Sequence, residues 1–282
     1  MTEVVRPRPG EEPFTRRTPR VVAAARLRRR RERDATGRFL AEGPRAVQEA
    51  LARPGTVREL FVTAEASQRH AGLVTTARST GVPVSPVTGD AVAVLAEAVT
   101  PQGLVAVCHQ LDRPLDRVLV GRPRLVAVLA DVREPGNAGT VLRTADAAGA
   151  GAVVFAGAAV DPYNGKCVRA SAGSLFHVEV VRHPDPAGVV GALRDGGWRV
   201  LAATAAGETD LEGLADTGAL AAPTAWLFGS EAHGLPPPLA TAADFRVRVP
   251  IHGRAESLNL GAAAAVCLYA SARAHRPEEP VR

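Results

Sequence analysis

The sequence predicts an α/β protein of two domains, in which the larger, C-terminal domain is built on a mostly parallel sheet with helices on both faces. The first observation is that short apolar stretches alternate with helix-like segments from residue 124 onward, a pattern typical of parallel strands joined by helices. The second is a shorter run of the same kind between residues 34 and 110. The third is a polar stretch with two prolines, residues 111–123, which separates the two and is expected to be a linker.

The composition is that of a globular protein. The chain has 282 residues, of which 46% are hydrophobic and 22% are charged, which suits one large or two ordinary domains. No stretch approaches the roughly 20 apolar residues of a membrane span, so none is expected. Cys108, Cys167 and Cys267 lie far apart, without a Cys-x-x-Cys pair or a histidine at ligand spacing. We therefore expect no disulfide, no metal site and a location in the reducing cytoplasm.

Positive charge is concentrated in the first 33 residues. They contain eleven arginines and four glutamates, a net charge of +7, whereas the whole chain carries +5. A general preference for arginine explains why Lys166 is the single lysine, but it does not explain this clustering. Because basic arms bind nucleic acids, residues 1–33 are predicted to form a flexible arm that contacts RNA. The arm lacks the apolar core of a secretion signal.

Residues 34–110 are predicted to form a small α/β domain. Before it, residues 1–19 hold four prolines among charges and are expected to be disordered when free, and a helix is expected at 21–33. The expected elements of the domain, in order, are a helix at 44–52, a strand at 59–63, a helix at 71–80, a strand at 82–86, a helix at 90–98 and a strand at 103–109.

The alternation continues in residues 124–282. The expected strands are 125–130, 152–155, 178–181, 199–203, 224–228 and 245–249. The expected helices are 139–148, 164–172, 186–195 and 258–274.

Three polar, glycine-bearing segments follow strands of this domain. They are residues 137–145, 228–236 and 249–259. In open α/β sheets, ligands bind at the carboxyl edge of the strands, where such segments meet. The last segment enters a helix, for which Ser257 or Asn259 is a suitable N-cap. The sequence therefore predicts a ligand site at this edge of the sheet.

Together the three segments resemble motifs 1, 2 and 3 of the SpoU (TrmH-like) family of RNA ribose 2′-O-methyltransferases, part of the SPOUT superfamily. The matching residues are Asn137, Gly139, Arg143, Thr144 and Ala145, then Gly229, Glu231, Gly234 and Leu235, then Pro250, Gly253, Ser257, Leu258 and Asn259. The resemblance implies S-adenosylmethionine as methyl donor, a SPOUT-type trefoil knot in residues 124–282 and a homodimer formed through that domain. Residues 39–43 and 100–103 resemble the ribosomal-protein-like substrate-binding domain of such enzymes, which implies that residues 34–110 bind RNA.

The resemblance assigns catalysis to five residues, with Arg143 at the centre. A guanidinium is always protonated and is a poor base, so holding a phosphate and stabilising negative charge on the 2′-oxygen is the physically easier role; the route of the proton stays open. Asn137 and Ser257 are expected to orient this arginine or the ribose. Glu231 would anchor Arg143, cap a helix or steady its loop, with anchoring preferred. Asn259 is expected to tie one loop to another.

The same family pattern points to four residues that face the cofactor. Gly229, Val249 and Leu258 are the matching positions, and Ile251 lies near them. Gly261 departs from the pattern; glycine inside a helix costs about 1 kcal/mol relative to alanine, and we interpret it as a point of close packing. Because the family's dimer uses this helix, the departure bears on dimer geometry.

The leading interpretation is an enzyme that methylates a ribose 2′-hydroxyl of structured RNA, with ribosomal RNA favoured and transfer RNA the close alternative. An RNA-binding or ribosome-assembly factor without turnover is the alternative from another class, and the intact set of polar motif residues argues against it. A nucleotide-dependent oxidoreductase comes third. Its fingerprint is missing, because Gly149 and Gly151 precede a strand and Val154 stands where a third glycine is needed.

Overall fold

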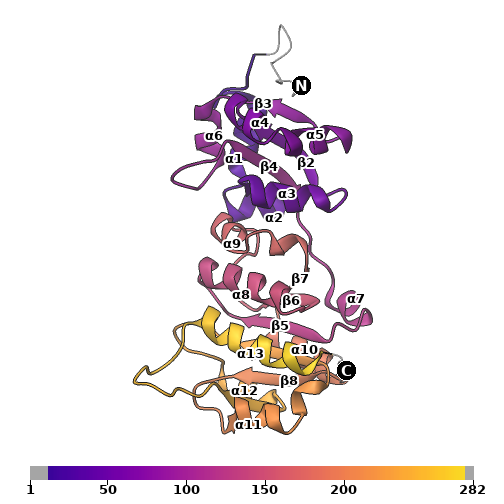
Figure 1. The fold of residues 1–282 in the computed structure, drawn as a ribbon, viewed down its shortest axis with the longest axis vertical. Helices are drawn as coiled ribbons and strands as arrows, with labels where there is room; N and C mark the ends of the chain where they lie inside the picture. Colours follow the sequence, from indigo (N-terminus) through magenta and orange to yellow (C-terminus); the bar gives the residue numbers. More distant parts are fainter. Residues whose placement is uncertain (1–11, 277–282) are drawn as a thin grey trace, which may run out of the picture. The chain divides into compact units, whose positions relative to one another are not determined.

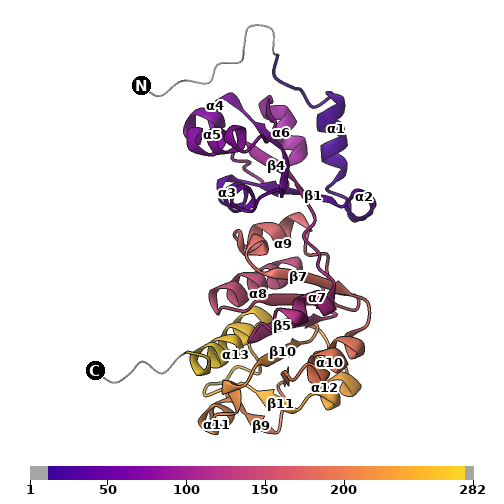
Figure 2. The same cartoon turned by 90° about the vertical axis from the view of Figure 1, so that its right-hand side faces the viewer.

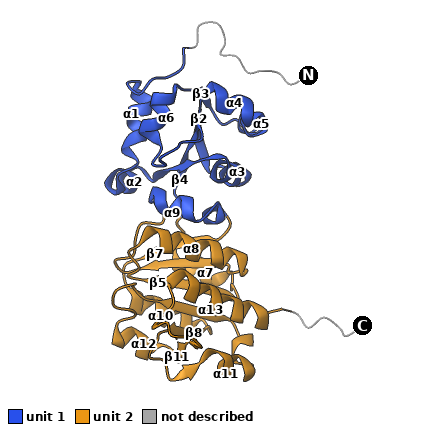
Figure 3. Ribbon diagram, turned by 60° about the vertical axis from the view of Figure 1, so that its left-hand side comes forward, with its two compact units in different colours: residues 1–111, 163–176 blue, residues 112–162, 177–282 orange. Residues whose placement is uncertain are grey.

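The computed structural model describes residues 12–276, which fall into two compact units. Unit 1 comprises the chain up to Leu111 together with Tyr163–Phe176, and unit 2 comprises Asp112–Pro162 and the chain from His177 onward (Figure 3). The segment Tyr163–Phe176 belongs to the C-terminal domain in sequence order. Its place in unit 1 therefore differs from the division expected from the sequence.

Unit 1 is built on a mixed four-stranded sheet (Figure 1). Its strands are β1 (Arg38–Glu42), β2 (Val57–Val62), β3 (Val84–Pro86) and β4 (Leu104–His109). They lie in the order β1-β4-β2-β3, with β4 antiparallel to both of its neighbours and β3 parallel to β2. Every residue of β4 except His109 is buried, as expected for a central strand covered on both faces.

Part of the N-terminal arm is folded onto this sheet, which corrects the expectation of a flexible arm. Residues 1–11 lie outside the described residues. From there the chain forms α1 (Pro19–Arg26) and α2 (Arg30–Thr36) in place of one helix at 21–33. Val21, Ala24 and Leu27 are spaced along one side of α1 and its end, and they are buried in a core shared with α6 (Gly89–Leu95). This apolar stripe outweighs the surrounding arginines, because burying it removes apolar area from water.

The other helices of unit 1 are α3 (Pro44–Ala52), α4 (Ala64–Arg69), α5 (Ala71–Ser79) and α9 (Gly165–Ala170), with a 3-10 turn at Ser174–Phe176. Helix α9 and this turn belong to the segment that joins unit 1 from the later part of the chain. Tyr163 and Phe176 pack their rings against Phe39 of β1, with centroids 4.7 and 6.1 Å away. Burial of three aromatic rings in one cluster accounts for the attachment of the segment.

Unit 2 contains a seven-stranded sheet in which every pair is parallel. Its strands are β5 (Leu125–Ala130), β6 (Ala152–Ala156), β7 (Glu179–His183), β8 (Arg199–Ala203), β9 (Thr209–Asp210), β10 (Thr224–Phe228) and β11 (Phe245–Arg248). Their order is β7-β6-β5-β10-β8-β11-β9. All residues of β5, β6 and β10 are buried, so these strands form the middle of a sheet covered on both faces.

Helices cover both faces of this sheet (Figure 2). One face carries α7 (Leu115–Val120), α10 (Pro186–Asp195) and α12 (Pro237–Ala242), whose apolar side chains join one core cluster. The other carries α8 (Pro135–Ala147), α11 (Leu211–Asp216) and α13 (Leu260–Ala274). The expected linker is thus partly helical, because Val118 is buried in the core with Leu115 and Leu119 packed against it. Strand β9 and helix α11 likewise occupy a stretch in which no element was expected.

The last helix, α13, returns to pack beside α8 and over β5 and β10. A Cβ atom at Gly261 would lie 2.7 Å from Thr140 Cγ2, so glycine permits this close approach of α13 to α8. The trefoil knot remains a prediction from the resemblance. None of the helices in the described residues is both long and apolar enough to cross a membrane.

Candidate functional site

The three motif segments leave the carboxyl ends of β5, β10 and β11. Strands β5 and β10 are neighbours, and β11 lies one strand further, beyond β8. Parallel strands end at a common edge, so their loops gather there. A cavity of about 700 Å³ lies at this edge and is lined by residues after β5 and β10: Asp131, Arg133, Glu134 and residues 230–237.

Three polar side chains from the three segments form one hydrogen-bonded chain. Asn137 donates from Nδ2 to Glu231 Oε1 at 3.0 Å, and Asn259 donates from Nδ2 to Asn137 Oδ1 at 3.2 Å. These contacts span 94 and 122 residues of sequence. We call Asn137, Glu231 and Asn259 the site trio. The trio joins the start of α8, the loop after β10 and the start of α13.

The Glu231 carboxylate also receives backbone groups from the segment that enters α8. Its oxygens accept from the N–H groups of Arg133, at 3.4 Å, and Glu134, at 3.3 Å. A helix start presents unpaired N–H groups and the positive end of a dipole, so a carboxylate is favourable there. In the described residues, Glu231 therefore does not form the expected ion pair with Arg143. The Glu231 oxygens accept hydrogen bonds from neutral N–H donors instead.

Asn259 has a second role as the N-cap of α13. Its Oδ1 accepts from Gly261 N at 2.8 Å, and the helix begins at Leu260, two residues later than expected. Because the cap uses Oδ1, the Nδ2 group is left to donate to Asn137. Ser257, the other candidate cap, is exposed and has no hydrogen-bond partner among the described residues.

The loop after β10 is a tight turn closed by its own backbone. Ser230 and Gly234 exchange two backbone hydrogen bonds, of 3.1 and 2.8 Å, and Gly234 has a φ of +67°. A Cβ atom at Gly229 would lie 2.1 Å from the carbonyl carbon of Gly234. Glycine at 229 is therefore required by the loop itself. His233 is exposed on this turn, as loop surface.

Arg143 lies on the exposed side of α8. The helix begins at Pro135, four residues earlier than expected, with Glu134 as its N-cap, so Arg143 falls in the third turn. Among the described residues its guanidinium has no hydrogen-bond or ion-pair partner, and it is exposed. A free guanidinium carries five donors arranged for bidentate contact with an oxyanion.

The proposed cofactor-facing positions after β11 lie on an open loop. Val249 is half-buried, whereas Ile251 and Leu258 belong to the few large hydrophobic residues that are exposed. None of the three lines the cavity after β5 and β10. The structure thus brings the site trio together and leaves Arg143, Ser257 and the apolar positions of the third segment on exposed surfaces.

Two contributors at this edge were missed from the sequence. Asp131 follows β5 with a φ of +56°, and its Oδ1 accepts from Ala158 N at 2.7 Å, which joins the loops after β5 and β6. Glu134 accepts from Gly136 N at 3.1 Å and starts α8. An acidic residue directly before proline is a recognisable helix start, so Glu134 carried a usable signal. No sequence signal indicated the positive φ of Asp131, since aspartate only sometimes adopts this conformation.

Chemically, this edge offers neutral amide groups held in place and a carboxylate already satisfied by N–H groups. The exposed guanidinium of Arg143, in the third turn of α8, is available to bind an anion. Among the described residues, no group of three or more histidine, cysteine, aspartate or glutamate side chains is placed to hold a metal ion. The arrangement suits positioning and charge stabilisation of a bound substrate.

Two family models match the chain. The SpoU rRNA Methylase family matches residues 124–269, and the MRM3-like substrate binding domain matches residues 18–106. The second match begins near the start of α1, which agrees with the packing of this helix in unit 1.

Curated relatives and a solved structure resemble nearly the whole chain. The 23S rRNA (guanosine(2553)-2′-O)-methyltransferase RlmP of Bacillus subtilis (strain 168) is 34% identical over 86% of this chain and 92% of its own length. The 23S rRNA (uridine(2479)-2′-O)-methyltransferase of Streptomyces viridochromogenes is 34% identical over 88% of this chain and 87% of its own. The crystal structure of the SpoU methyltransferase AviRb from Streptomyces viridochromogenes in complex with the cofactor AdoMet has a TM-score of 0.77, with 33% identity over 90% of this chain and 98% of that one.

Proposed function

The chain belongs to the SpoU rRNA methylase family, and on that premise we propose that it transfers a methyl group from S-adenosylmethionine to a ribose 2′-hydroxyl of 23S ribosomal RNA. The observation that carries the proposal is the site trio, which ties three motif segments together at one edge of the sheet. In the described part of the chain, the exposed guanidinium of Arg143 has no partner. Two curated relatives that cover most of this chain are named as 23S rRNA 2′-O-methyltransferases, which favours this RNA over transfer RNA.

The residues at this edge fit S-adenosylmethionine. The cavity after β5 and β10 is bordered by the backbone of a tight turn, which offers hydrogen-bonding groups without bulky side chains. Ile251 and Leu258 expose apolar surface of the kind that covers an adenine. Gly229 and Val249 are the other two positions that we assign to cofactor binding. When bound, the cofactor supplies an activated methyl group on its sulfonium. The chain's own task is to hold the ribose in line with that group.

Arg143 binds the phosphate next to the target ribose and stabilises negative charge as it develops on the 2′-oxygen. The guanidinium is always protonated, so it acts by charge and hydrogen bonding and leaves the proton to another acceptor. Since Arg143 has no ion-pair partner in the part of the chain that the structure describes, no such pair must break there before it binds an oxyanion. Asn137 and Ser257 are assigned to the orientation of the ribose or of Arg143.

Glu231 and Asn259 act through the positions of the loops. Glu231 holds the entry to α8 through the N–H groups of Arg133 and Glu134, and Asn259 fixes the start of α13 against Asn137. Each joins the carboxyl end of one strand to another. Their contribution to catalysis is therefore the geometry of the pocket.

The test uses S-adenosylmethionine labelled on its methyl group and unmodified 23S ribosomal RNA transcripts, with 16S ribosomal RNA, transfer RNA and DNA of the 23S sequence in parallel. Alkaline cleavage needs a free 2′-hydroxyl, so a ribose methyl leaves the label in an alkali-resistant dinucleotide. We expect such dinucleotides from 23S RNA alone, since DNA lacks the acceptor hydroxyl. Label in mononucleotides would contradict ribose methylation, and label in transfer RNA alone would contradict the ribosomal substrate.

We further propose that the enzyme is a cytoplasmic homodimer formed through unit 2. Val266 and Tyr269 on α13 are exposed, although helices of a monomer usually turn such side chains inward. Light scattering coupled to gel filtration should give twice the mass of one chain. Val266→Glu should shift the protein to the monomer, and an unchanged mass in this variant would place the interface elsewhere.

A further inference from the structure

The turn between α1 and α2 carries a dense group of positive charges. Five arginines, which we call the arginine turn, lie within six residues of sequence: Arg26, Arg28, Arg29, Arg30 and Arg31. All five are exposed. Like charges this close repel one another and raise the free energy of the folded protein. A cluster of this kind is therefore expected either to have acidic partners in the protein or to bind an anion.

The structure divides the five arginines into two classes. Arg28 donates to the carbonyl of Val94 at 3.4 Å and lies 3.9 Å from the Glu97 carboxylate. Arg30 lies 3.5 Å from Asp34, one helical turn further along α2. The side chains of Arg26, Arg29 and Arg31, in contrast, have no hydrogen-bond or ion-pair partner among the described residues. Three cations are thus left without an internal counter-charge.

Acidic groups on the neighbouring helix do not neutralise these three cations. Asp90, at the start of α6, lies 3.8 Å from Arg16, and Glu97, just beyond its end, faces Arg28 and Arg169. Glu32 is the acidic residue nearest in sequence, and it is partly buried in the first turn of α2. The charge of Arg26, Arg29 and Arg31 therefore faces solvent.

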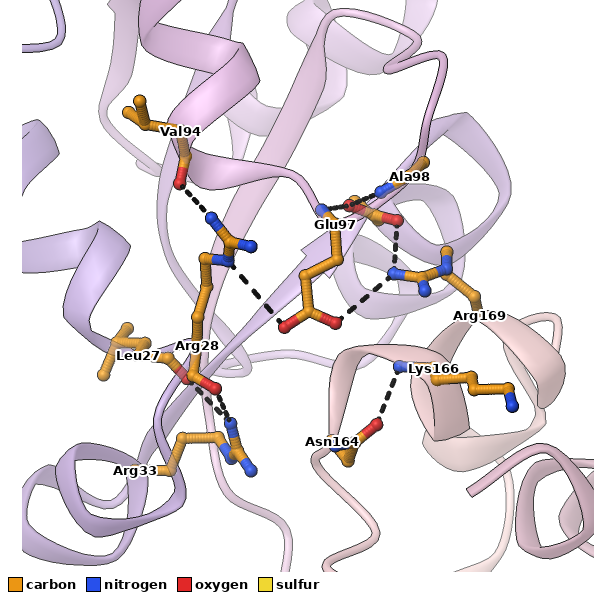
Figure 4. A network of polar contacts seen from close by, with 10 residues as sticks. Leu27, Arg28, Arg33, Val94, Glu97, Ala98, Asn164, Lys166 and Arg169 are labelled. Carbon is orange, nitrogen blue, oxygen red and sulfur yellow. Dashed lines mark hydrogen bonds and ion pairs between the residues drawn. The ribbon is translucent and has the colours of Figure 1, made fainter. Parts of the chain in front are cut away.

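A buried arginine holds the arginine turn in one shape. The side chain of Arg33 is 3% exposed, and its Nη1 donates to the carbonyl oxygens of Leu27, at 3.0 Å, and Arg28, at 2.9 Å (Figure 4). Burying a guanidinium is costly unless its N–H groups find acceptors. Here they bind carbonyls that the end of α1 leaves free. Leu27 anchors the same turn in the core of unit 1, so the free arginines stand on a fixed backbone.

We propose that Arg26, Arg29 and Arg31 form a surface that binds the phosphate backbone of the RNA substrate. The proposal rests on the proposed function, which supplies a polyanion as substrate. Guanidinium groups bind phosphate oxygens in a bidentate manner, and the fixed turn reduces the entropy lost on binding. The surface lies in the part of the chain matched by a substrate binding domain, and it contacts backbone phosphates without reading sequence.

The test compares variants of equal charge. R26Q/R29Q/R31Q removes the three free cations of the turn, and the control R45Q/R69Q/R78Q removes three exposed arginines from α3, α4 and α5 of the same unit. Affinity for a 23S ribosomal RNA transcript is measured at several salt concentrations. Each phosphate contact contributes roughly 0.7–0.9 to the slope of log K against log salt. We expect the first variant to lower the slope by about 2, and the control to leave it near that of the wild type.

Charge and folding are separated by two further measurements. R26K/R29K/R31K keeps the charge and should keep the slope, and thermal unfolding of all three variants should match the wild type because every altered side chain is exposed. An unchanged slope in R26Q/R29Q/R31Q, or an equal loss in the control, would overturn the proposal. RNA binding is measured without methyl transfer, so a protein that fails to methylate 23S RNA but shows the expected slopes would contradict the proposed function and retain this surface.

Discussion

Two polar networks in this chain use a glutamate to gather donors from distant segments, and they differ in what happens to the arginine. In unit 1, Glu42 of β1 accepts from the N–H of Glu97 at 2.7 Å and from Arg169 at 2.7 Å. In unit 2, Glu231 accepts from Asn137 and from two backbone N–H groups, and Arg143 has no partner within residues 12–276. The first network satisfies a guanidinium internally, whereas the second is built from an amide and backbone N–H donors.

Exposure explains the contrast. The Glu42 side chain is 12% exposed and sits where β1, the end of α6 and α9 meet, so its charge needs a close counter-ion. Glu231 is exposed and needs only hydrogen bonds, which an amide and the start of α8 provide. A carboxylate–arginine pair therefore holds segments together in unit 1. In unit 2 neutral donors hold the segments together, and we propose that the exposed Arg143 serves the substrate.

The largest effect is expected for Arg143→Ala. Loss of charge stabilisation in the transition state should lower kcat by roughly two to three orders of magnitude, while affinity for S-adenosylmethionine and the melting temperature stay near the wild type. Single-turnover methylation and calorimetric titration measure the two quantities. The matched variant is Arg169→Ala, which should lower stability instead. Poor cofactor binding together with normal turnover in Arg143→Ala would contradict the contrast between a catalytic Arg143 and a stabilising Arg169.

Glu42→Ala is expected to have the next largest effect. It removes the closer of the two carboxylates that contact Arg169 and leaves the N–H groups of Glu97 and Ala98 without their acceptor, so the free energy of unfolding should fall by about 2 kcal/mol. Urea unfolding should be followed by circular dichroism, because both tryptophans, Trp198 and Trp226, lie in unit 2.

The control for Glu42→Ala is Glu65→Ala. Glu65 also pairs with an arginine, Arg69, but its side chain is 78% exposed. An exposed pair contributes about 0–1 kcal/mol, so this variant should unfold close to the wild type. Equal losses in the two variants would show that burial does not distinguish the pairs.

Glu231→Ala tests the exposed network. It removes the acceptor of Asn137 Nδ2 and of two backbone N–H groups, so kcat/KM should fall about tenfold, the scale of one to two lost hydrogen bonds. Glu231→Gln keeps one carbonyl oxygen and should recover part of the loss. The control is Asp216→Ala on α11, an exposed carboxylate without a hydrogen-bond or ion-pair partner in residues 12–276, and it should be as active as the wild type. A fall in stability without a fall in kcat/KM would assign Glu231 a structural role like that of Glu42.

The smallest effect is expected for Gly261→Ala, which alters the packing beneath the unit 2 network. The added Cβ would meet Thr140 Cγ2 at 2.7 Å, and a crowded core typically costs 1–3 kcal/mol. The better helix propensity of alanine offsets about 1 kcal/mol, so a net loss of about 1 kcal/mol is expected in thermal unfolding.

Thr140→Ser is the matched second change for Gly261→Ala. It removes the crowded methyl group and keeps the hydroxyl that donates to the carbonyl of Gly136 at 2.9 Å. The double variant should therefore be more stable than Gly261→Ala alone. Additive losses in the two variants would show that α13 does not approach α8 at this point.

Elements of the fold, and residues that a local sequence pattern marks, were predictable from the sequence. Alternation of apolar stretches gave the parallel sheet of unit 2, because a strand buried on both faces must be apolar throughout. The match to the family's motifs singled out Asn137, Arg143, Glu231 and Asn259, and Gly261 stood out because glycine is unfavourable inside a helix. Each of these signals is read from neighbours along the chain.

Tertiary structure decided which groups meet across the chain. Four arginines in a row indicate a solvated segment, and only the packing of Val21, Ala24 and Leu27 shows that this segment is folded. The partner of Glu231 was an amide 94 residues away, and that of Glu42 was a guanidinium 127 residues away. The same carboxylate chemistry is compatible with either partner. Burial decides between them, because the cost of leaving a charge unpaired rises as water is removed, and burial is a property of the assembled fold.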